Sequence, residues 1–376
     1  MYQDNPFIIE GYLSPEYFCD RKEETALLID HITNGRNVAL IATRRLGKSG
    51  LIHNAFFQPE IQSTYYTFFV DIYETKNMNE LAYELGKNIL SVLKSQGKKA
   101  WEKFLNVLIS LNHSITFNSE GMPIWSVKIG DIKHPDTTLD EIFEYLSNAD
   151  RPCIVAIDEF QQIASYPEKT VEASLRKRIQ NCHNAHFIYS GSQRHMMSQI
   201  FASPSRPFYN SCAIMGLAPI DERTYFDFAN EHLATSLKSI SQDAFHYLYD
   251  KFCGITWYIQ YILNQLYALK TQEITLDTKD VDKAIDDVIR RNSFVYSSLI
   301  FQLSTKQKQL LYGIVKERGT TSIMSQAFLN RYSLSASTVQ TAIKALLEHD
   351  FVTREEDGSY IVYDRFLDLW IMRSME

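Results

Sequence analysis

The chain has 376 residues with a formal net charge of −7, and 45% of its residues are hydrophobic while 22% are charged. This is ordinary globular composition, which excludes a disordered chain, and the length suggests two or three domains. The net negative charge argues against a protein coated with nucleic acid but leaves room for a local basic site.

Five cysteines are present, and none forms a Cys-x-x-Cys pair. This usage indicates a reducing compartment and no zinc site of that type. No run of about 18 apolar residues occurs, and the N-terminus lacks a basic segment followed by an apolar one. We therefore expect a cytoplasmic protein without a membrane partner.

Short apolar strands alternate with amphipathic helices over the first 216 residues. Helices are expected at 21–32, from Gly47 onward and at 79–93, and strands at 37–42, 65–72, 153–157 and 186–190. Strands that are apolar on both faces and separated by helices predict a parallel sheet covered on both sides. Residues 1–216 are thus expected to form a three-layer α/β core. The stretch from about 98 to 135 is expected to be an insertion, made of a helix followed by a hairpin.

The remaining residues predict two smaller domains. Residues 217–303 form an all-helical pattern, with helices expected at 222–232, 243–251, 257–270 and 278–290. From residue 304, helices are expected at 305–316, 322–331 and 335–349, followed by strands at 351–353 and 360–362. Asp357-Gly358 between these strands is a strong hairpin signal. We expect a helical lid and then a winged helix-turn-helix at 304–376.

A candidate phosphate site follows the first strand. The segment Ala42–Ser49 fits the P-loop pattern G-x-x-x-x-G-K-[ST], except that Ala42 replaces the first glycine. In such a loop Gly47 allows a close backbone approach, Lys48 places a cation on the β- and γ-phosphates, and Ser49 coordinates Mg²⁺. A Gly-Lys-Ser tripeptide also arises by chance, but the strand before it and the helix after it favour phosphate binding.

Acidic residues end a later strand, 153–157. Asp158 is expected to hold Mg²⁺ through its water shell, and Glu159 to orient and polarise the attacking water. The alternative is a strand that merely ends in solvated acids. Ser192, after the strand at 186–190, is the candidate to sit between the γ-phosphate and that water, with Gln193 second. A serine that caps the next helix is the alternative there.

These motifs together resemble the archaeal-type ATPase family, within the AAA+/STAND branch of P-loop NTPases, over nearly the whole chain. The resemblance rests on Phe18-Cys19-Asp20-Arg21-Lys22-Glu23-Glu24, Ala42–Ser49, Asp158-Glu159-Phe160-Gln161, Ser190-Gly191-Ser192 and Arg206-Pro207-Phe208-Tyr209. It implies an ASCE/AAA+-like P-loop fold that binds ATP with Mg²⁺. The nucleotide-binding residues that it implies are Arg21, Arg44, Arg45, Leu46, Gly47, Lys48, Ser49 and Gly50, with Ser49 and Asp158 on the metal. The lid departs from the family, which usually has Gly-x-Pro where this chain has Gly254-Ile255-Thr256.

Phosphoryl transfer also needs positive charge on the γ-phosphate, which an arginine of the same chain or of a neighbour supplies. Arg194 and Arg206 are the candidates, and prolines stiffen the loop around Arg206. The alternative for Arg206 is a surface arginine bonded to its own loop. Arg44 and Arg45 are expected around the nucleotide or against a partner.

The expected winged helix has no excess of positive charge with which to bind the phosphates of DNA. Residues 304–376 hold nine Lys or Arg and nine Asp or Glu, and the wing turn Arg354-Glu355-Glu356-Asp357-Gly358 is acidic. The exposed face expected for its third helix is Ser337, Thr338, Thr341 and Lys344, with one cation. Because phosphate neutralisation dominates DNA affinity, a packing or protein-contact role is favoured over DNA. The basic run Arg176-Lys177-Arg178 is interpreted as a solvated helix face.

Two functions fit these observations. The first is an Mg²⁺-dependent, slow ATPase in which ATP and ADP switch contacts with a protein partner or a second copy. The second is a DNA-binding regulator or scaffold that holds nucleotide with negligible turnover. The acid pair Asp158-Glu159 favours hydrolysis, and also favours water over another acceptor such as a kinase substrate. A ring-forming motor is disfavoured because no aromatic-glycine pore signature is found.

Overall fold

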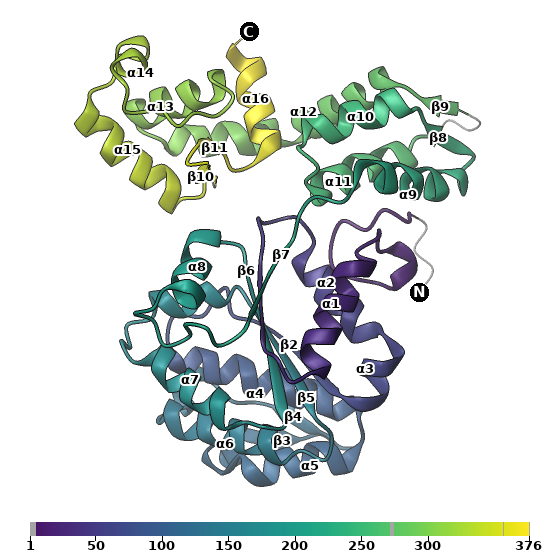
Figure 1. Cartoon of the computed structure of the whole chain (residues 1–376), viewed down its shortest axis with the longest axis vertical. Coiled ribbons are helices and arrows are strands. Elements are labelled where there is room, and N and C mark those ends of the chain that lie inside the picture. The colour runs from purple at the N-terminus through teal and green to yellow at the C-terminus, as the bar shows by residue number, and fades with distance from the viewer. Residues whose placement is uncertain (1–4, 271–273, 356, 376) are drawn as a thin grey trace. The chain divides into compact units, whose positions relative to one another are not determined.

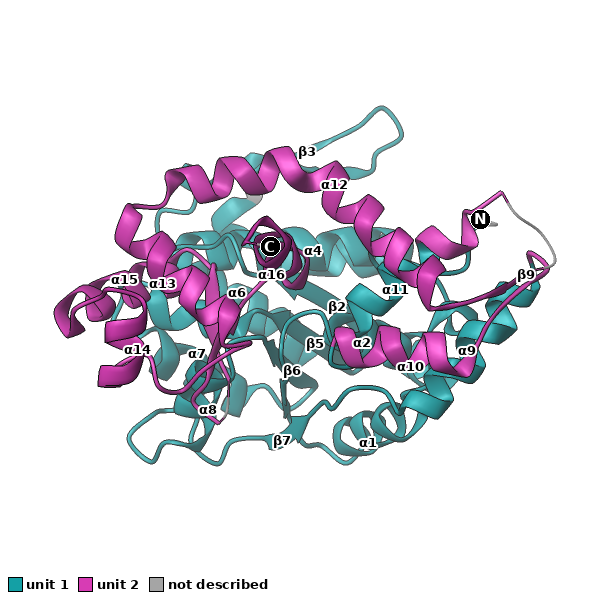
Figure 2. Ribbon diagram, turned by 90° about the horizontal axis from the view of Figure 1, so that it is seen from above, with its two compact units in different colours: residues 1–235, 253–264 teal, residues 236–252, 265–376 magenta. Residues whose placement is uncertain are grey.

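A computed structural model describes residues 5–270, 274–355 and 357–375. The chain divides into two compact units, residues 1–235 with 253–264 and residues 236–252 with 265–376 (Figure 2). These two units are defined by compactness and do not test the predicted domain limits at residues 216 and 303, which stay predictions. None of the helices in the described ranges is long and apolar enough to cross a membrane.

A parallel five-stranded sheet forms the centre of the first unit (Figure 1). Its strands, in spatial order, are β2 (Tyr66–Asp71), β5 (Cys153–Asp158), β6 (Ala185–Gly191), β1 (Val38–Ile41) and β7 (Ala213–Gly216). The four predicted strands and their parallel pairing are confirmed, and β7 is an addition. Ile41 pairs with Gly191, and Asp71 with Asp158. The carboxyl ends of β1, β2, β5 and β6 therefore meet at one edge of the sheet.

Helices cover both faces of this sheet, which confirms the three-layer prediction (Figure 1). Alternate strand residues pack to opposite sides: Val155 and Ile157 belong to one buried cluster, and Ile154 and Ala156 to the other. The first cluster includes side chains of α4 (Met78–Ser95), α6 (Pro135–Asn148), α7 (Val171–Asn181) and α8 (Arg194–Ala202). The second includes side chains of α1 (Lys22–Thr33), α2 (Lys48–Phe57) and α3 (Pro59–Thr64).

The stretch at 98–135 is a helix followed by a hairpin, as predicted. It comprises α5 (Lys98–Val107), the 3₁₀ turns Ile109–Ser114 and Ile129–Asp131, and the antiparallel pair β3 (Ile115–Phe117) and β4 (Pro123–Trp125). The Trp125 ring lies so close to Gly86 of α4 that a Cβ atom there would come within 3.0 Å of it. The hairpin is therefore anchored on α4. The first unit also contains the 3₁₀ turns Pro15–Tyr17 and Phe160–Ser165, α9 (Glu222–Ala234) and the first part of α11 (Thr256–Tyr267).

The second unit contains α10 (Gln242–Lys251), the short parallel pair β8 (Lys238–Ile240) and β9 (Ile274–Leu276), and the long helix α12 (Thr278–Gln302). The prediction that α12 ends at residue 290 is wrong. The helix continues for twelve more residues, and Tyr296 and Ile300 extend its buried face. Trp370 donates from Nε1 to Ser293 Oγ at 3.0 Å, which ties the last helix to this extension.

The winged helix is confirmed nearly residue by residue. It consists of α13 (Thr305–Lys316), α14 (Gln326–Arg331), α15 (Ala336–Glu348) and the hairpin β10 (Val352–Arg354) with β11 (Tyr360–Val362). A further helix, α16 (Arg365–Met375), was not predicted. Val339, Ala342 and Leu346 form the buried face of α15, and Ile343 beside them is half-buried.

Candidate active site

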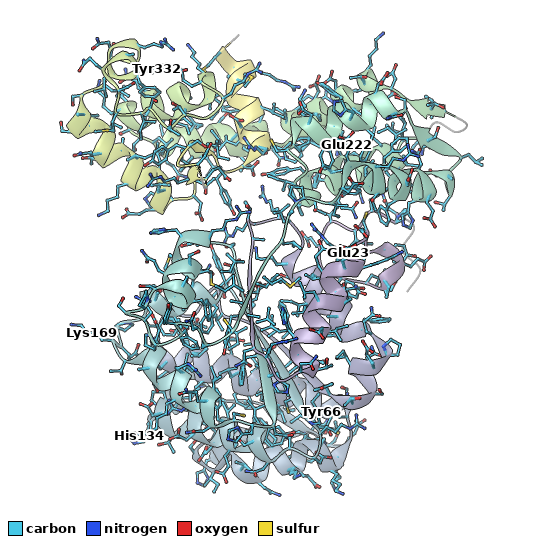
Figure 3. All side chains as sticks on the ribbon, in the orientation of Figure 1. Glu23, Tyr66, His134, Lys169, Glu222 and Tyr332 are labelled. Atoms are coloured by element: carbon cyan, nitrogen blue, oxygen red, sulfur yellow. The ribbon has the colours of Figure 1, made fainter. Side chains whose placement is uncertain are left out.

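A cavity of about 300 Å³ lies in the first unit beside the phosphate loop. Its walls come from the N-terminal segment between Ile8 and Arg21, the loop Arg44–Gly50 and the beginning of α11, together with Glu159 and Ile220. In Figure 3, Glu23 in the first turn of α1 lies toward the upper end of the first unit, and Tyr66 at the amino end of β2 lies lower on the same side. All eight predicted nucleotide-binding residues line this cavity.

The loop between β1 and α2 is organised around the ammonium group of Lys48. Gly47 has φ 94°, which places the loop in a left-handed turn immediately before α2. Lys48 Nζ donates to the carbonyl oxygens of Ala42 at 2.9 Å and Thr43 at 3.3 Å. Burial lowers the pKa of Lys48, while the carboxylates of Glu159 and Asp158 oppose that shift. A phosphate that replaced the two carbonyls would pair this buried cation with an anion.

The predicted metal ligands meet at the edge of the sheet. Ser49 Oγ donates to Asp158 Oδ2 at 2.8 Å, although the two residues are 109 positions apart. A hydroxyl and a carboxylate are the hard oxygen donors that suit Mg²⁺, which takes its remaining ligands from water and substrate phosphates. The donor set therefore fits this ion.

Asp71, at the end of the neighbouring strand β2, was missed by sequence reasoning. Burial raises the pKa of Asp71, and the nearby charges of Asp158 and Glu159 raise it further. The sequence does contain a signal for this residue, because Asp71 is an acidic residue at the end of an apolar strand. Its register beside Asp158 emerges only from strand pairing.

Glu159 is held by donors from two strand ends. Its own backbone is left-handed, with φ 55°. Its Oε2 accepts hydrogen bonds from Ser192 Oγ at 2.7 Å and from Gln161 Nε2. Arg44 Nε lies 3.9 Å from Oε1 of the same carboxylate. The structure thus brings Ser192 and Arg44 to Glu159, and adds Gln161, to which the sequence had assigned no role.

Two side chains hold the carbonyl of Leu46 from opposite parts of the chain. Arg21, which is 3% exposed, donates from Nη1 to Glu24 at 2.7 Å and from Nη2 to Leu46 O at 3.3 Å. Thr256, at the start of α11, donates from Oγ1 to Leu46 O at 3.4 Å. The segment before α1, through Arg21, and the start of α11, through Thr256, therefore both bond the phosphate loop.

Arg45 turns toward α11. Its guanidinium lies over the rings of Trp257 at 4.4 Å and Tyr258 at 4.9 Å, and it donates to the Tyr258 hydroxyl. The backbone N–H of Trp257 donates to Arg45 O at 3.0 Å. Cation–π contacts of this kind contribute about 0.5–2 kcal/mol each. Sequence reasoning placed Arg45 near nucleotide or a partner but had no signal for these aromatic neighbours.

Arg206 is not among the residues that line the cavity. It forms a two-pronged pair with Glu172 of α7, in which Nε lies 3.0 Å from Oε2 and Nη2 bonds Oε1. The alternative expectation, that Arg206 bonds its own loop, does not account for this pair, because Glu172 belongs to α7. Arg194, at the start of α8, lowers the pKa of Lys48 through the repulsion between the two positive charges.

In the basic run Arg176-Lys177-Arg178, Arg178 pairs with Asp136 at 2.9 Å and with Asp140 at 2.7 Å, so part of the positive charge of this run is neutralised.

Comparison with known proteins supports the same fold. No curated protein matches the chain in sequence. Residues 294–373 match a family described as a probable winged helix domain. Three solved structures are similar over nearly their whole length. The Walker-type ATPase of Pyrococcus abyssi is 15% identical with a TM-score of 0.65, covering 98% of this chain and 99% of that one.

The ORC2 protein of Aeropyrum pernix, solved in ADPNP–ADP complexes, is 14% identical with a TM-score of 0.55, covering 98% of both chains. The ORC1 protein of the same organism, solved in complex with DNA, is 12% identical with a TM-score of 0.54, covering 96% of this chain and 94% of that one. The chain thus shares with these three proteins a fold built on a parallel α/β sheet, with a helical region, and its C-terminal part matches a winged helix. The resemblance to the archaeal-type ATPases is confirmed at the level of the fold.

Proposed function

We propose that the chain binds ATP with Mg²⁺ in the cavity beside the phosphate loop, hydrolyses it slowly, and acts as a nucleotide-controlled switch. The observation that carries this proposal is the meeting of Lys48, Ser49 and Asp158 at one edge of the sheet, with Glu159 next to them. A P-loop cation, a metal-binding pair and an acid for water activation are the parts that P-loop hydrolysis requires.

Each residue then has a distinct role. Lys48 and the backbone N–H groups that follow Gly47 bind the β- and γ-phosphates. Ser49 and Asp158 would hold Mg²⁺, which would neutralise charge on the phosphate oxygens. Glu159 accepts a proton from the attacking water, and Ser192, which is bonded to that carboxylate, orients it. Arg194 or Arg206 supplies charge to the γ-phosphate, Arg206 acting on a neighbouring copy.

The experiment that tests this function measures phosphate release from Mg-ATP together with nucleotide binding. We expect Glu159→Gln to retain binding and lose release, and Lys48→Ala to lose both. Lys87→Ala, an exposed cation on α4, is the matched control and should behave as wild type. Release from wild type that equals a buffer blank would contradict the proposal.

The switch part of the proposal rests on how α11 is joined to the loop. Because Trp257 N–H and Thr256 Oγ1 bond the carbonyls of Arg45 and Leu46, any shift of the loop on phosphate binding pulls on α11. ATP and ADP would then favour different positions of this helix. Amide hydrogen exchange in α11, compared between ATP-bound Glu159→Gln and the ADP form, tests this coupling.

The second candidate is a DNA-binding regulator or scaffold that holds nucleotide with negligible turnover. The winged-helix match favours it, as does the solved complex of the ORC1 protein with DNA. The charges argue the other way, because Lys344, the exposed cation of α15, lies 3.8 Å from Glu348. We therefore propose a protein partner or a second copy for this domain. We also propose a cytoplasmic setting for the protein, because none of its five cysteines, all of them among the described residues, is in a disulfide. A gel shift across salt concentrations, with and without ATP, decides between the two.

A further inference from the structure

Helix α11 crosses the cavity from the phosphate loop to the N-terminal segment. Its first residue, Thr256, bonds Leu46 O, and two turns later Asn264 Nδ2 donates to Phe7 O at 2.8 Å. Gln260 lies one turn from each contact and lines the cavity. Gln260 therefore lies between the contact with the phosphate loop and the contact with the N-terminal segment, whose Ile8 and Ile9 line the same cavity. The base of a nucleotide whose phosphates bind the loop would reach this part of the cavity.

Gln260 is a buried polar side chain, and in the part of the chain that the structure describes only one of its two amide atoms has a hydrogen-bond partner. It is 8% exposed, and its amide oxygen is placed 3.3 Å from the hydroxyl of Tyr225, which is itself fully buried. Within the described ranges the other amide atom of Gln260 has no hydrogen-bond partner. Burying an amide costs free energy unless both ends are bonded. The unused end is not among the described side-chain atoms that are buried without a partner, so it reaches the open cavity, where a bound ligand can pair with it.

The hydrogen-bond balance around Tyr225 decides which end faces the cavity. The Tyr225 hydroxyl lies 3.2 Å from the carbonyl of Thr256, which can only accept. One hydroxyl proton cannot serve both this carbonyl and the Gln260 oxygen. A half-turn of the amide, which exchanges its oxygen and nitrogen, satisfies both contacts: Tyr225 donates to Thr256 O and accepts from Gln260 Nε2. Gln260 Oε1 then faces the cavity.

We propose that Gln260, oriented by Tyr225, selects adenine over a 6-oxopurine by accepting a hydrogen bond from the 6-amino group. Hypoxanthine and guanine carry an oxygen at that position, and two facing oxygens repel. This inference rests on the proposed ATP binding, and it adds the residue that sets the base preference. A site that hydrogen-bonds one substrate group discriminates against an analogue that lacks it, because its buried polar atom is then left unpaired.

The test compares the affinities of the wild type and three variants for ADP and inosine diphosphate, which differ at the 6-position and the adjacent ring nitrogen, by isothermal calorimetry. Wild type should prefer ADP. Gln260→Leu should reduce the ADP-to-inosine-diphosphate ratio by about tenfold, the equivalent of one hydrogen bond. Gln260→Glu, which accepts but does not donate, should keep the preference. Tyr225→Phe frees the amide to turn and should reduce the ratio while ADP still binds.

The ratio is the quantity to compare, because the added charge of Gln260→Glu weakens both diphosphates alike. An unchanged ratio in Gln260→Leu would overturn the proposal. A loss of preference in Gln260→Glu as large as that in Gln260→Leu would also overturn it, since a donor would then face the base. Should the leucine variant fail to fold, Tyr225→Phe, which removes only a hydroxyl, still decides the question. Wild type that binds neither diphosphate would instead refute the proposed function.

Discussion

Ser192 Oγ donates a hydrogen bond of 2.7 Å to Oε2 of Glu159, joining the end of β6 to the end of β5. The same carboxylate oxygen also accepts from Gln161, whose amide is buried against Gly191. Glu159 is thus fixed by two donors before any nucleotide is bound. The position of its carboxylate therefore depends on the space beside Gly191.

Gly191→Ala tests this dependence. An added Cβ would come within 3.0 Å of both Gln161 Oε1 and Met197 Sδ, so the amide must move and Glu159 loses a donor. We expect phosphate release to fall at least tenfold while ATP binding is retained, with a lower unfolding temperature. Gly216→Ala, at the end of β7 with nothing within 4 Å of the new Cβ, is the matched control. Equal phosphate release in the two variants would show that Gln161 does not position Glu159.

Arg45→Ala removes the guanidinium from the faces of Trp257 and Tyr258. In wild type we expect nucleotide binding to change the fluorescence of Trp257, because Arg45 belongs to the phosphate loop. The alanine variant should lose this response and still bind nucleotide through Lys48. Trp257→Phe identifies the contribution of this ring among the four tryptophans. Arg151→Ala, whose guanidinium lies over Tyr66, is the control. A full response in Arg45→Ala would contradict the coupling.

Arg206→Ala should retain ATP binding and lose turnover if this arginine completes the site of a neighbouring copy. Because Arg206 does not line the cavity of its own chain, mixing Arg206→Ala with Lys48→Ala should restore part of the activity. In the mixture, an intact arginine then faces an intact phosphate loop. Glu172→Gln, which weakens the partner of Arg206 without removing the arginine, serves as control. Wild-type turnover by Arg206→Ala alone would exclude the role.

Asp368 in α16 makes a pH-dependent contribution to stability. Burial raises its pKa to about 6, while Arg365, 3.7 Å away, partly opposes the shift. Between pH 4 and 6 the unfolded chain ionises this carboxyl while the folded chain keeps it protonated. Stability therefore falls by up to about 3 kcal/mol as pH rises through this window, and is constant above it.

Asp368→Asn removes the titration, so its stability relative to wild type should increase from pH 4 to pH 7. The measurement is the difference in unfolding midpoint between variant and wild type at several pH values. Asp250→Asn, which replaces an exposed carboxyl in the same unit, is the matched control. A constant difference across the range would contradict the raised pKa.

The sequence-based predictions succeeded where the signal was local. Apolar runs such as 153–157 predicted strands, and the alternation of strands and helices predicted the parallel sheet, because periodicity reports burial directly. The fixed spacings that phosphate chemistry requires led to the candidate residues Ala42–Ser49 and Asp158-Glu159, and the structure brings Ser49 and Asp158 together. The winged helix was found from three helices and a hairpin turn.

What escaped the sequence depends on contacts between distant segments. Gln260 and Trp257 line the cavity only because the start of α11 contacts the phosphate loop at Leu46. The residues of α11 themselves carry no sequence pattern that predicts this contact. The pairing of Arg206 with Glu172 is of the same kind. The end of α12 was misplaced because polar residues around 290 interrupt a pattern that resumes at Tyr296.

The most direct test of the central claim is single-turnover phosphate release from Mg-ATP by wild type and by Glu159→Gln. Both proteins should bind ATP with similar affinity, and only wild type should release phosphate, in a reaction abolished by removing Mg²⁺. Equal release by both would show that Glu159 does not activate water. Absence of release from ATP-bound wild type would contradict hydrolysis itself.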